Sequence, residues 1–174
     1  MNYTKISRRI SYSLRHNPYS IKLHIDKHGW APVSDLILAL GITMEDLEHI
    51  VYTDNKSRYS FNENKSKIRA NQGHSIPVDL ELKPMQPPDI LYHGIAQQFI
   101  ENIFSHGISK MSRQYVHLST NPDQALSVGK RHGEPIILVI NSKEMYNNGY
   151  RFYLSENKIW LTDNVPVKYI SKYN

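Results

Sequence analysis

Arginine and histidine side chains gather in three short segments of this 174-residue chain, each at the expected end of a helix or strand. Arg15 and His16 end a helical pattern, Arg69 lies where a hairpin ends, and Arg131 lies in a glycine-bracketed loop. Arginine is permanently charged and binds phosphate oxygens in pairs, whereas histidine exchanges protons near neutral pH. The three segments are therefore candidates for a site that binds phosphate and moves a proton.

Each segment also has an ordinary explanation. Cations at helix C-termini often contact the last carbonyls, which would account for Arg15, His16 and the loop of Arg131, and Arg69 could be a solvated hairpin residue. Two further features come from strands: a histidine beside a glycine, and a histidine and a hydroxyl on one side of a strand, where side chains alternate. These are His93 with Gly94 and His117 with Ser119. A lone strand histidine is more often a packed core residue, but five such features together favour a shared function.

The composition excludes several classes of protein. The chain has no cysteine, hence no disulfide and no cysteine nucleophile. The motifs of dinucleotide folds, P-loop enzymes, zincins and α/β-hydrolases are absent. The histidines form no recognisable ligand set, so we predict no metal site. No apolar run reaches about 18 residues and the N-terminus is polar, so we expect no membrane segment or signal peptide and a cytoplasmic location. The net charge of +5 fits an anionic ligand or RNA, and plain solubility equally well.

A proline-rich segment divides the chain. Three prolines lie between Lys83 and Asp89, where they can neither continue a helix nor sit inside a central strand. We therefore predict two lobes, 1–83 and 90–174, joined by a stiff linker over 84–89.

The first lobe is expected to contain a helix, a strand, two helices and a hairpin, which is the order of a winged helix. The expected elements are a helix over Ile6–Leu14 ended by Asn17-Pro18, a strand over 21–25, a helix from a Ser34 cap to Leu40 closed by Gly41, a helix opened by Thr43 and Asp46, and a hairpin of 58–61 with 67–70.

The second lobe is expected to be rich in short strands, with two or three small helices. The expected strands are 90–93, 115–118, a fully buried one over 135–140, 152–154, 158–161 and 167–170, and the helices are 99–106 and 122–129. Both lobes together predict an α+β fold class.

Taken in order and spacing, these segments resemble the RNA 2′-phosphotransferase family, which includes the tRNA 2′-phosphotransferases that complete tRNA splicing in eukaryotes. The resemblance covers essentially the whole chain, through the segments 13–16, 28–30, 68–75, 91–94, 116–119, 129–133 and 159–162.

The resemblance implies a winged-helix RNA-binding lobe, followed by an NAD-binding lobe of the ADP-ribosyltransferase type. It also implies a reaction in two steps. An internal RNA 2′-phosphate attacks the nicotinamide ribose of NAD and releases nicotinamide, leaving an ADP-ribosylated RNA 2′-phosphate. Transesterification by the ribose 2″-hydroxyl then yields 2′-hydroxyl RNA and ADP-ribose 1″,2″-cyclic phosphate.

By the same resemblance, the catalytic residues are Arg15, His16, Arg69 and Arg131. Arg69 and Arg131 would clamp the 2′-phosphate, Arg15 would help to neutralise it, and His16 would exchange a proton with the ribose hydroxyl. The NAD-binding residues implied are His93, Gly94, His117 and Ser119. The expected partners are 2′-phosphorylated RNA and NAD as co-substrate, with no metal or membrane requirement, and we expect a monomer.

Two features depart from the wider pattern. The family usually has Thr after Tyr-His-Gly, where this chain has Ile95, so one hydroxyl contact near NAD would be lost. Many ADP-ribosyltransferases carry a late glutamate, where the segment 157–160 has an apolar residue. A phosphate dianion needs no deprotonation to attack, so the missing glutamate is consistent with the reaction.

Two alternatives stay open. The protein could be an ADP-ribosyltransferase acting on a nucleic-acid terminal phosphate or on a protein, without the second step. It could also be a winged-helix nucleic-acid-binding regulator with a ligand-sensing second lobe. The three acidic residues of segment 44–49 would repel DNA phosphates and count against the regulator.

Overall fold

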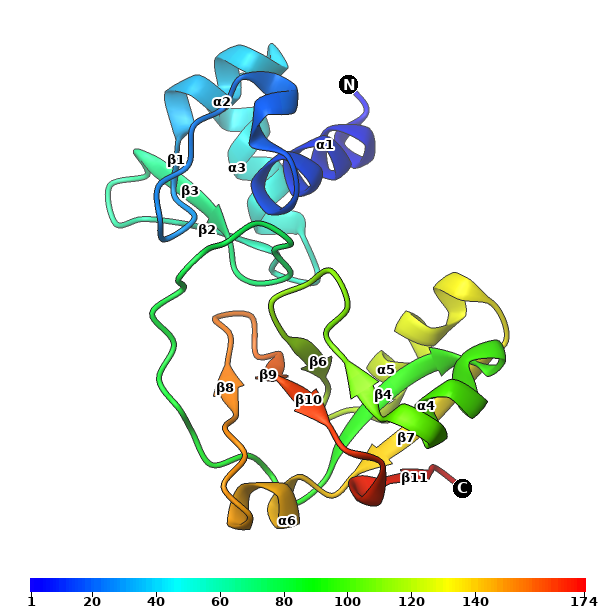
Figure 1. Cartoon of the computed structure of the whole chain (residues 1–174). Coiled ribbons are helices and arrows are strands. Elements are labelled where there is room, and N and C mark those ends of the chain that lie inside the picture. The colour runs from blue at the N-terminus through cyan, green and yellow to red at the C-terminus, as the bar shows by residue number, and fades with distance from the viewer. The chain divides into compact units, whose positions relative to one another are not determined.

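Helices and small antiparallel sheets alternate along the computed structural model, which describes residues 1–174 (Figure 1). The chain divides into two units, Met1–Glu81 and Leu82–Asn174. Every paired strand is antiparallel, and the sheets have two or three strands each. The α+β class predicted from the sequence is confirmed. None of the helices is both long and apolar enough to cross a bilayer.

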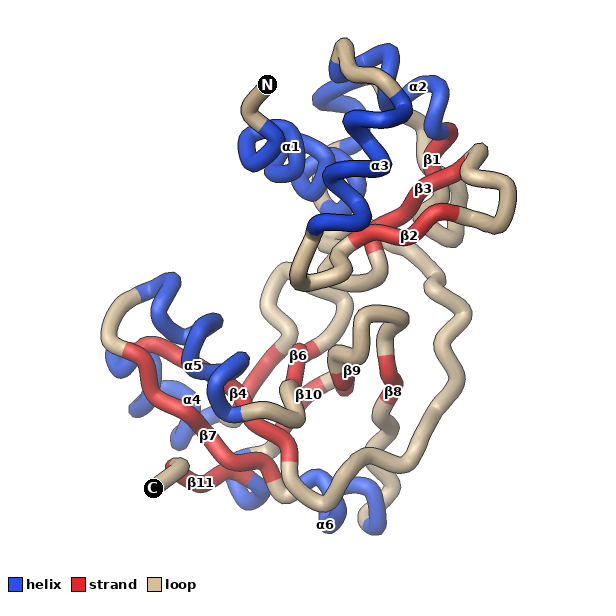
Figure 2. The backbone as a smooth tube through the Cα atoms, turned by 180° about the vertical axis from the view of Figure 1, so that it is seen from behind, coloured by secondary structure: helices blue, strands red, loops and turns tan.

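The first unit packs three helices against a three-stranded sheet (Figure 2). Its elements are α1 (Tyr3–Arg15), the 3₁₀ helix η1 (Pro18–Ile21), β1 (Ala31–Pro32), α2 (Val33–Leu40), α3 (Met44–Thr53), β2 (Tyr59–Phe61) and β3 (Lys67–Ala70). The sheet has the order β1-β3-β2. Ile10 and Leu14 of α1 are fully buried with Ile68 of β3, so the apolar face predicted for this helix faces the core.

Several local predictions for this unit are confirmed. Gly41 ends α2 in the left-handed conformation, with φ of 63°. Thr43 and Asp46 form a capping box at the start of α3, where Thr43 Oγ1 accepts from Asp46 N–H at 3.2 Å. The hairpin forms with Phe61 opposite Ile68.

Two predictions for the first unit are wrong. The segment 21–25 is not a strand, because Pro18 begins a 3₁₀ turn and Lys22 follows with a positive φ of 55°. The strand instead comes at Ala31–Pro32, which is too short to show alternation and is specified by its pairing with β3. Ser34 does not cap α2, since the helix already begins at Val33 after Pro32.

The second unit contains three small sheets, of order β11-β7-β4, β6-β9-β8 and β10-β5. Its elements are β4 (Leu91–Ala96), η2 (Gln97–Phe99), α4 (Ile100–His106), β5 (Ile108–Ser109), β6 (Val116–Leu118), α5 (Pro122–Gly129), η3 (Lys130–His132), β7 (Pro135–Ile140), α6 (Ser142–Asn147), β8 (Tyr153–Leu154), β9 (Trp160–Thr162), β10 (Asn164–Val165), η4 (Val167–Tyr169) and β11 (Ile170–Lys172). Leu91, Leu138 and Phe152 are fully buried in its core.

The predicted helices of this unit are confirmed, including Asn121 as the cap of α5 with Pro122 in its first turn. The strand over 167–170 is wrong, because Val167–Tyr169 is a 3₁₀ helix and the strand starts at Ile170. The prediction that 135–140 is fully buried is also wrong. Only Leu138 and Ile140 of β7 are buried, because alternate side chains leave through the other face of a three-stranded sheet.

The proline-rich segment is attached by hydrogen bonds to the second unit. Met85 N–H donates to Phe152 O at 2.8 Å, and Pro88 O accepts from the Ser142 hydroxyl at 2.6 Å. These bonds hold the residues leading into β4.

Candidate active site

The end of α1 and the segment after β3 are joined directly. Ser75 N–H donates to Arg15 O at 2.9 Å, and Ser75 Oγ lies 2.8 Å from His16 Nδ1. These bonds connect residues about sixty positions apart in the sequence, and they hold the backbone of Arg15 and the side chain of His16 at this junction. The contact with Ser75 Oγ holds the His16 ring through Nδ1.

Arg69 of β3 is fixed by neutral groups. Its guanidinium carbon lies 4.4 Å from the centre of the Trp30 ring, and Nη1 donates to His28 O at 3.4 Å. Its Nε is buried without a hydrogen-bond partner. A ring and a carbonyl orient the guanidinium plane without cancelling its charge, so Arg69 is prepared to bind an anion. The role of Trp30 was not predicted from the sequence.

His74 lies among the predicted catalytic side chains of the first unit. It is only 1% exposed, and neither ring nitrogen has a hydrogen-bond partner. Burial, followed by electrostatic repulsion from Arg15, His16 and Arg69, lowers the pKa of His74 from 6.5 to about 4. The structure therefore brings Arg15, His16 and Arg69 together around a histidine that is neutral at physiological pH.

The backbone after β3 is anchored by the hairpin. Asn71 N–H donates to Arg58 O and Asn71 Nδ2 donates to Ser57 O, both at 2.8 Å. The side-chain oxygens of Asn71 and Gln72 are buried without partners. Sequence analysis singled out neither amide, although both lie within the segment 68–75.

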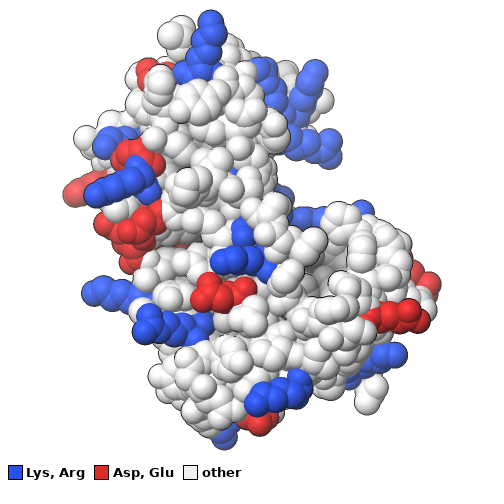
Figure 3. All heavy atoms as spheres, in the orientation of Figure 1, with Lys and Arg blue, Asp and Glu red and all other residues white.

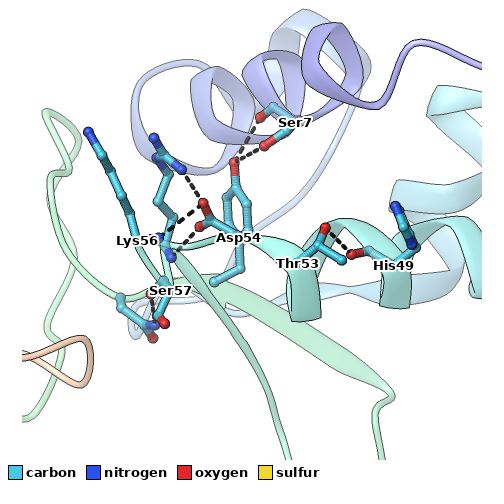
Figure 4. A network of polar contacts seen from close by, with 9 residues as sticks. Ser7, His49, Thr53, Asp54, Lys56 and Ser57 are labelled. Carbon is cyan, nitrogen blue, oxygen red and sulfur yellow. Dashed lines mark hydrogen bonds and ion pairs between the residues drawn. The ribbon is translucent and has the colours of Figure 1, made fainter.

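A polar network supports this anchor (Figure 4). The Asp54 carboxylate accepts from the backbone N–H of Lys56 and Arg58 and forms an ion pair with the Arg58 side chain. These bonds shape the turn whose carbonyls hold Asn71. Nearby, the Tyr59 hydroxyl donates to Ser7 O at 2.8 Å and ties the hairpin to α1.

A second group of basic side chains lies in the second unit. His93 Nδ1 lies 2.9 Å from His117 O, and because a carbonyl only accepts, this nitrogen carries the proton. Burial lowers the pKa of His93, so its ring is neutral and Nε2 is an acceptor. Arg113 Nη1 donates to His117 Nδ1 at 3.3 Å, which places the proton of a neutral His117 on Nε2. One ring thus offers an acceptor and the other a donor.

Arg113 is the functional candidate that sequence reasoning missed in this unit. Burial lowers its pKa, and the positive charge of Arg131 lowers it further, so the two guanidinium groups feel each other. Arg131 itself is exposed on η3. The sequence feature that could have identified Arg113 is its position four residues before His117, on the segment leading into β6.

Gly94 and Ser119 have structural contacts in addition to any role toward a ligand. A Cβ at Gly94 would lie 1.6 Å from Ala125 O, so helix α5 packs directly on the backbone of β4 here. Ser119 Oγ lies 2.8 Å from Gln124 Oε1 and accepts from Asn121 N–H at 3.1 Å, at the start of the same helix. The backbones of Ser119 and Tyr92 also exchange two hydrogen bonds, which join the strand ends of β4 and β6.

The predicted site residues are distributed over both units. Arg15, His16 and Arg69 converge in the first unit, whereas Arg131 and the four residues His93, Gly94, His117 and Ser119 belong to the second. No three histidine, aspartate or glutamate side chains gather where they could hold a metal ion. Each unit combines arginines with histidines, and the tautomers of His93 and His117 in the second unit are defined by their partners. Such an arrangement suits a ligand rich in phosphate and hydroxyl groups.

Comparison with known proteins connects this arrangement to a family. The family model described as "RNA 2′-phosphotransferase, Tpt1 / KptA family" matches residues 2–164. A protein of Fusobacterium nucleatum named probable RNA 2′-phosphotransferase is 54% identical, over 97% of this chain and 98% of its own length. Proteins with the same name from Flavobacterium johnsoniae and Acaryochloris marina are 48% and 44% identical, over 95% and 94% of this chain and 93% of each relative. The resemblance seen in the sequence is confirmed, and the chain belongs to the RNA 2′-phosphotransferase, Tpt1 / KptA family.

Proposed function

We propose that this protein is an RNA 2′-phosphotransferase that removes an internal 2′-phosphate from RNA by transferring it to NAD. The first unit, with its helices and hairpin, would be the winged-helix RNA-binding lobe. The second would be an ADP-ribosyltransferase-like lobe that binds NAD. The products would be nicotinamide, 2′-hydroxyl RNA and ADP-ribose 1″,2″-cyclic phosphate.

The observation that carries the proposal is the convergence of Arg15, His16 and Arg69 on the neutral ring of His74. Like charges brought together in a partly buried site repel each other, and a bound anion relieves that repulsion. Arg69, whose contacts are a ring and a carbonyl, keeps its charge for such an anion. A 2′-phosphate that acts first as nucleophile and then as electrophile needs this neutralisation in both steps.

His16 is suited to the proton transfer in the second step. Its Nδ1 is held by Ser75 Oγ at 2.8 Å, which orients the ring, and Nε2 would take a proton from a ribose hydroxyl. Neutral His74 beside it has no unpaired positive charge to repel the proton. Arg15 and Arg69 would neutralise the phosphate that this hydroxyl attacks, and Arg131 would add a further cation.

The residues of the second unit fit NAD, which would supply the ribose carbon that accepts the phosphate. His93 Nε2 can accept from a hydroxyl and His117 Nε2 can donate, while Arg113 suits a pyrophosphate. Ile95 is buried and carries no hydroxyl, so the contact usually made by Thr would be absent.

The direct test is an assay with a 2′-phosphorylated oligoribonucleotide. We expect loss of the 2′-phosphate, with release of nicotinamide and the cyclic phosphate, only when NAD is supplied. The activity should persist in EDTA, because arginines neutralise the phosphate. Matched controls are the same oligonucleotide with a 2′-hydroxyl and one with a terminal phosphate. Stable ADP-ribosylation of the terminal phosphate, with the 2′-phosphate untouched, would favour the alternative ADP-ribosyltransferase, and activity abolished by EDTA and restored by metal would contradict the proposed site.

A further inference from the structure

A basic hollow of about 360 Å³ lies on the outer face of α1, and the proposed chemistry does not use it. It is lined by Lys5, Arg8, Arg9 and Tyr12 of α1 and by Ser20 and Ile21 of η1.

The residues of this hollow form a stripe that leads to the candidate site. Lys5, Arg9, Tyr12 and His16 follow one another at intervals of three or four residues, so they lie on one face of the helix. The opposite face, with Ile10, is buried in the core. From Lys5 to His16 the stripe rises by about 16 Å along the helix axis. The cations therefore lie beside the candidate site and would contact groups next to the reacting phosphate.

The charge of the hollow is not neutralised within the protein. The helix carries no acidic residue, and the ion pairs of the structure involve His28, Arg58 and Lys65. Lys5, Arg8 and Arg9 are all exposed. In Figure 3, blue side chains project from the first unit on the side where Figure 1 shows α1. This face therefore attracts an anionic chain. Binding is favoured because the counterions condensed on that chain are released.

An aromatic ring lies among these cations. Tyr12 is 50% exposed, and its ring centre lies 6.1 Å from that of His16. The 3₁₀ helix η1, whose Ser20 and Ile21 line the hollow, also carries Tyr19, which is 75% exposed. Cations that follow a backbone, together with open aromatic faces, are the combination that binds single-stranded nucleic acid without sequence preference. An acidic peptide would contact the cations, but its carboxylates would not stack on the aromatic rings.

We propose that this α1 face, defined by Lys5, Arg8, Arg9 and Tyr12, docks the RNA strand flanking the 2′-phosphate. The cations contact neighbouring phosphodiesters, and Tyr12 stacks on a base next to the reacting nucleotide. The stripe then presents the 2′-phosphate to Arg15 and His16. This inference rests on the proposed function for its substrate, but binding of RNA to the face is measurable without turnover.

The test compares two triple variants of the full chain by fluorescence anisotropy with a short, unmodified single-stranded oligoribonucleotide. Lys5→Gln/Arg8→Gln/Arg9→Gln should bind about ten-fold or more weakly, and the slope of log affinity against log salt should fall by about two, at about 0.7 per lost phosphate contact. The control Lys143→Gln/Arg151→Gln/Lys172→Gln removes the same charge from exposed positions of the second unit and should bind within about two-fold of wild type.

Substitutions at Tyr12 separate the contribution of base stacking to RNA binding from that of charge. Tyr12→Ala should weaken RNA binding about five-fold or more, whereas Tyr12→Phe keeps the ring and should bind like wild type. Because all four side chains are exposed, equal thermal unfolding midpoints are expected for every variant. In turnover, the triple variant should raise KM for a 2′-phosphorylated oligonucleotide with kcat unchanged, and leave KM for a 2′-phosphorylated dinucleotide unchanged.

Different failures have different meanings. Wild-type RNA binding by the triple variant, or an equal loss in the control, would overturn the α1 docking face. A triple variant that loses affinity for polyglutamate but not for RNA would also overturn it, in favour of an acidic protein partner. If wild-type protein binds RNA through this face yet leaves 2′-phosphate untouched, the proposed function fails and the docking face stands.

Discussion

At the scale of single residues, three positively charged or titratable side chains surround one buried histidine. His74 keeps its ring neutral because burial and the charges of Arg15, His16 and Arg69 all disfavour a further proton. A positive charge on His74 would be repelled by the neighbouring cations. The neutral ring of His74 packs near Gly29 without this repulsion. A Cβ added at Gly29 would lie 3.5 Å from His74 Nε2.

Arg69 and Arg131 should each be needed for turnover. We expect Arg69→Ala and Arg131→Ala to lower kcat/KM by at least about two orders of magnitude, because each removes charge-assisted contacts to the transferring phosphate. Lysine should recover only part of the rate, since a point charge lacks the planar fork. The control Arg151→Ala changes an exposed arginine of the second unit and should be close to wild type. Near wild-type turnover in either test variant would mean that the arginine does not contact the phosphate.

His16 should separate the two steps. His16→Ala should still form the ADP-ribosylated RNA, because the first attack by the phosphate needs no proton removed, and this intermediate should accumulate. Arg69→Ala should slow both steps. A single-turnover time course on labelled RNA resolves the intermediate as a slower-migrating band. If His16→Ala stops before that band appears, His16 acts in binding or in the first step.

His74 should make stability depend on pH. Its folded pKa of about 4 lies below the ordinary value of 6.5, so the unfolded chain binds more protons between these values. The free energy of unfolding should therefore fall as pH drops from 6.5 towards 4, by up to about 3 kcal/mol from this residue. Urea titrations across this range should show a shallower pH slope for His74→Gln, which cannot titrate. Equal slopes in both proteins would contradict the buried, neutral histidine.

At the scale of elements, the contact of α5 with β4 depends on two glycines. A Cβ at Gly94 would lie 1.6 Å from Ala125 O, and one at Gly129 would lie 2.8 Å from Ile95 O. Both collisions are with backbone atoms, which cannot rotate away as a side chain can. The close approach holds the helix that follows Ser119 and leads into the loop of Arg131.

Gly94→Ala should therefore destabilise the folded protein. We expect it to lower the free energy of unfolding by at least about 3 kcal/mol, because β4 and α5 must separate to accept the methyl group. Denaturant unfolding measures this, and Ser127→Ala on the exposed side of α5 should change stability by less than about 0.5 kcal/mol. If Gly94→Ala left stability unchanged but weakened NAD binding, Gly94 would instead be needed so that NAD can approach the backbone closely.

At the scale of the whole molecule, each of the two units carries its own basic group. The first has Arg15 and Arg69, and the second has Arg113 and Arg131, where the charge of Arg131 is felt at Arg113. Each of these two groups is suited to an anion.

The binding of NAD and the binding of 2′-phosphorylated RNA should depend on different arginines. Arg113→Gln should weaken NAD binding about ten-fold and leave the affinity for 2′-phosphorylated RNA within about two-fold. Arg69→Ala should do the reverse. Titration calorimetry with each ligand alone measures both constants. Loss of both ligands in either variant would show that the two binding functions cannot be assigned to separate units.

Patterns confined to a few neighbouring residues predicted much of the fold. The apolar spacing of α1, the Thr43 and Asp46 capping box, and Asn121-Pro122 at α5 were all sufficient, because each signal lies in residues at most four positions apart. Patterns that depend on a partner strand were not. The strand at 31–32 is too short to show alternation, and 21–25 alternates without pairing.

For the site, the sequence by itself determined which side chains could bind phosphate, since charge and proton exchange belong to a residue type. Arg15, His16, Arg69 and Arg131 are candidates on this ground. Only the tertiary structure decided that the first three surround a neutral His74, that Arg113 contacts His117, and that Gly94 meets α5. Burial and the charges of distant neighbours create these properties. Both depend on contacts between segments tens of residues apart, which no local pattern in the chain encodes.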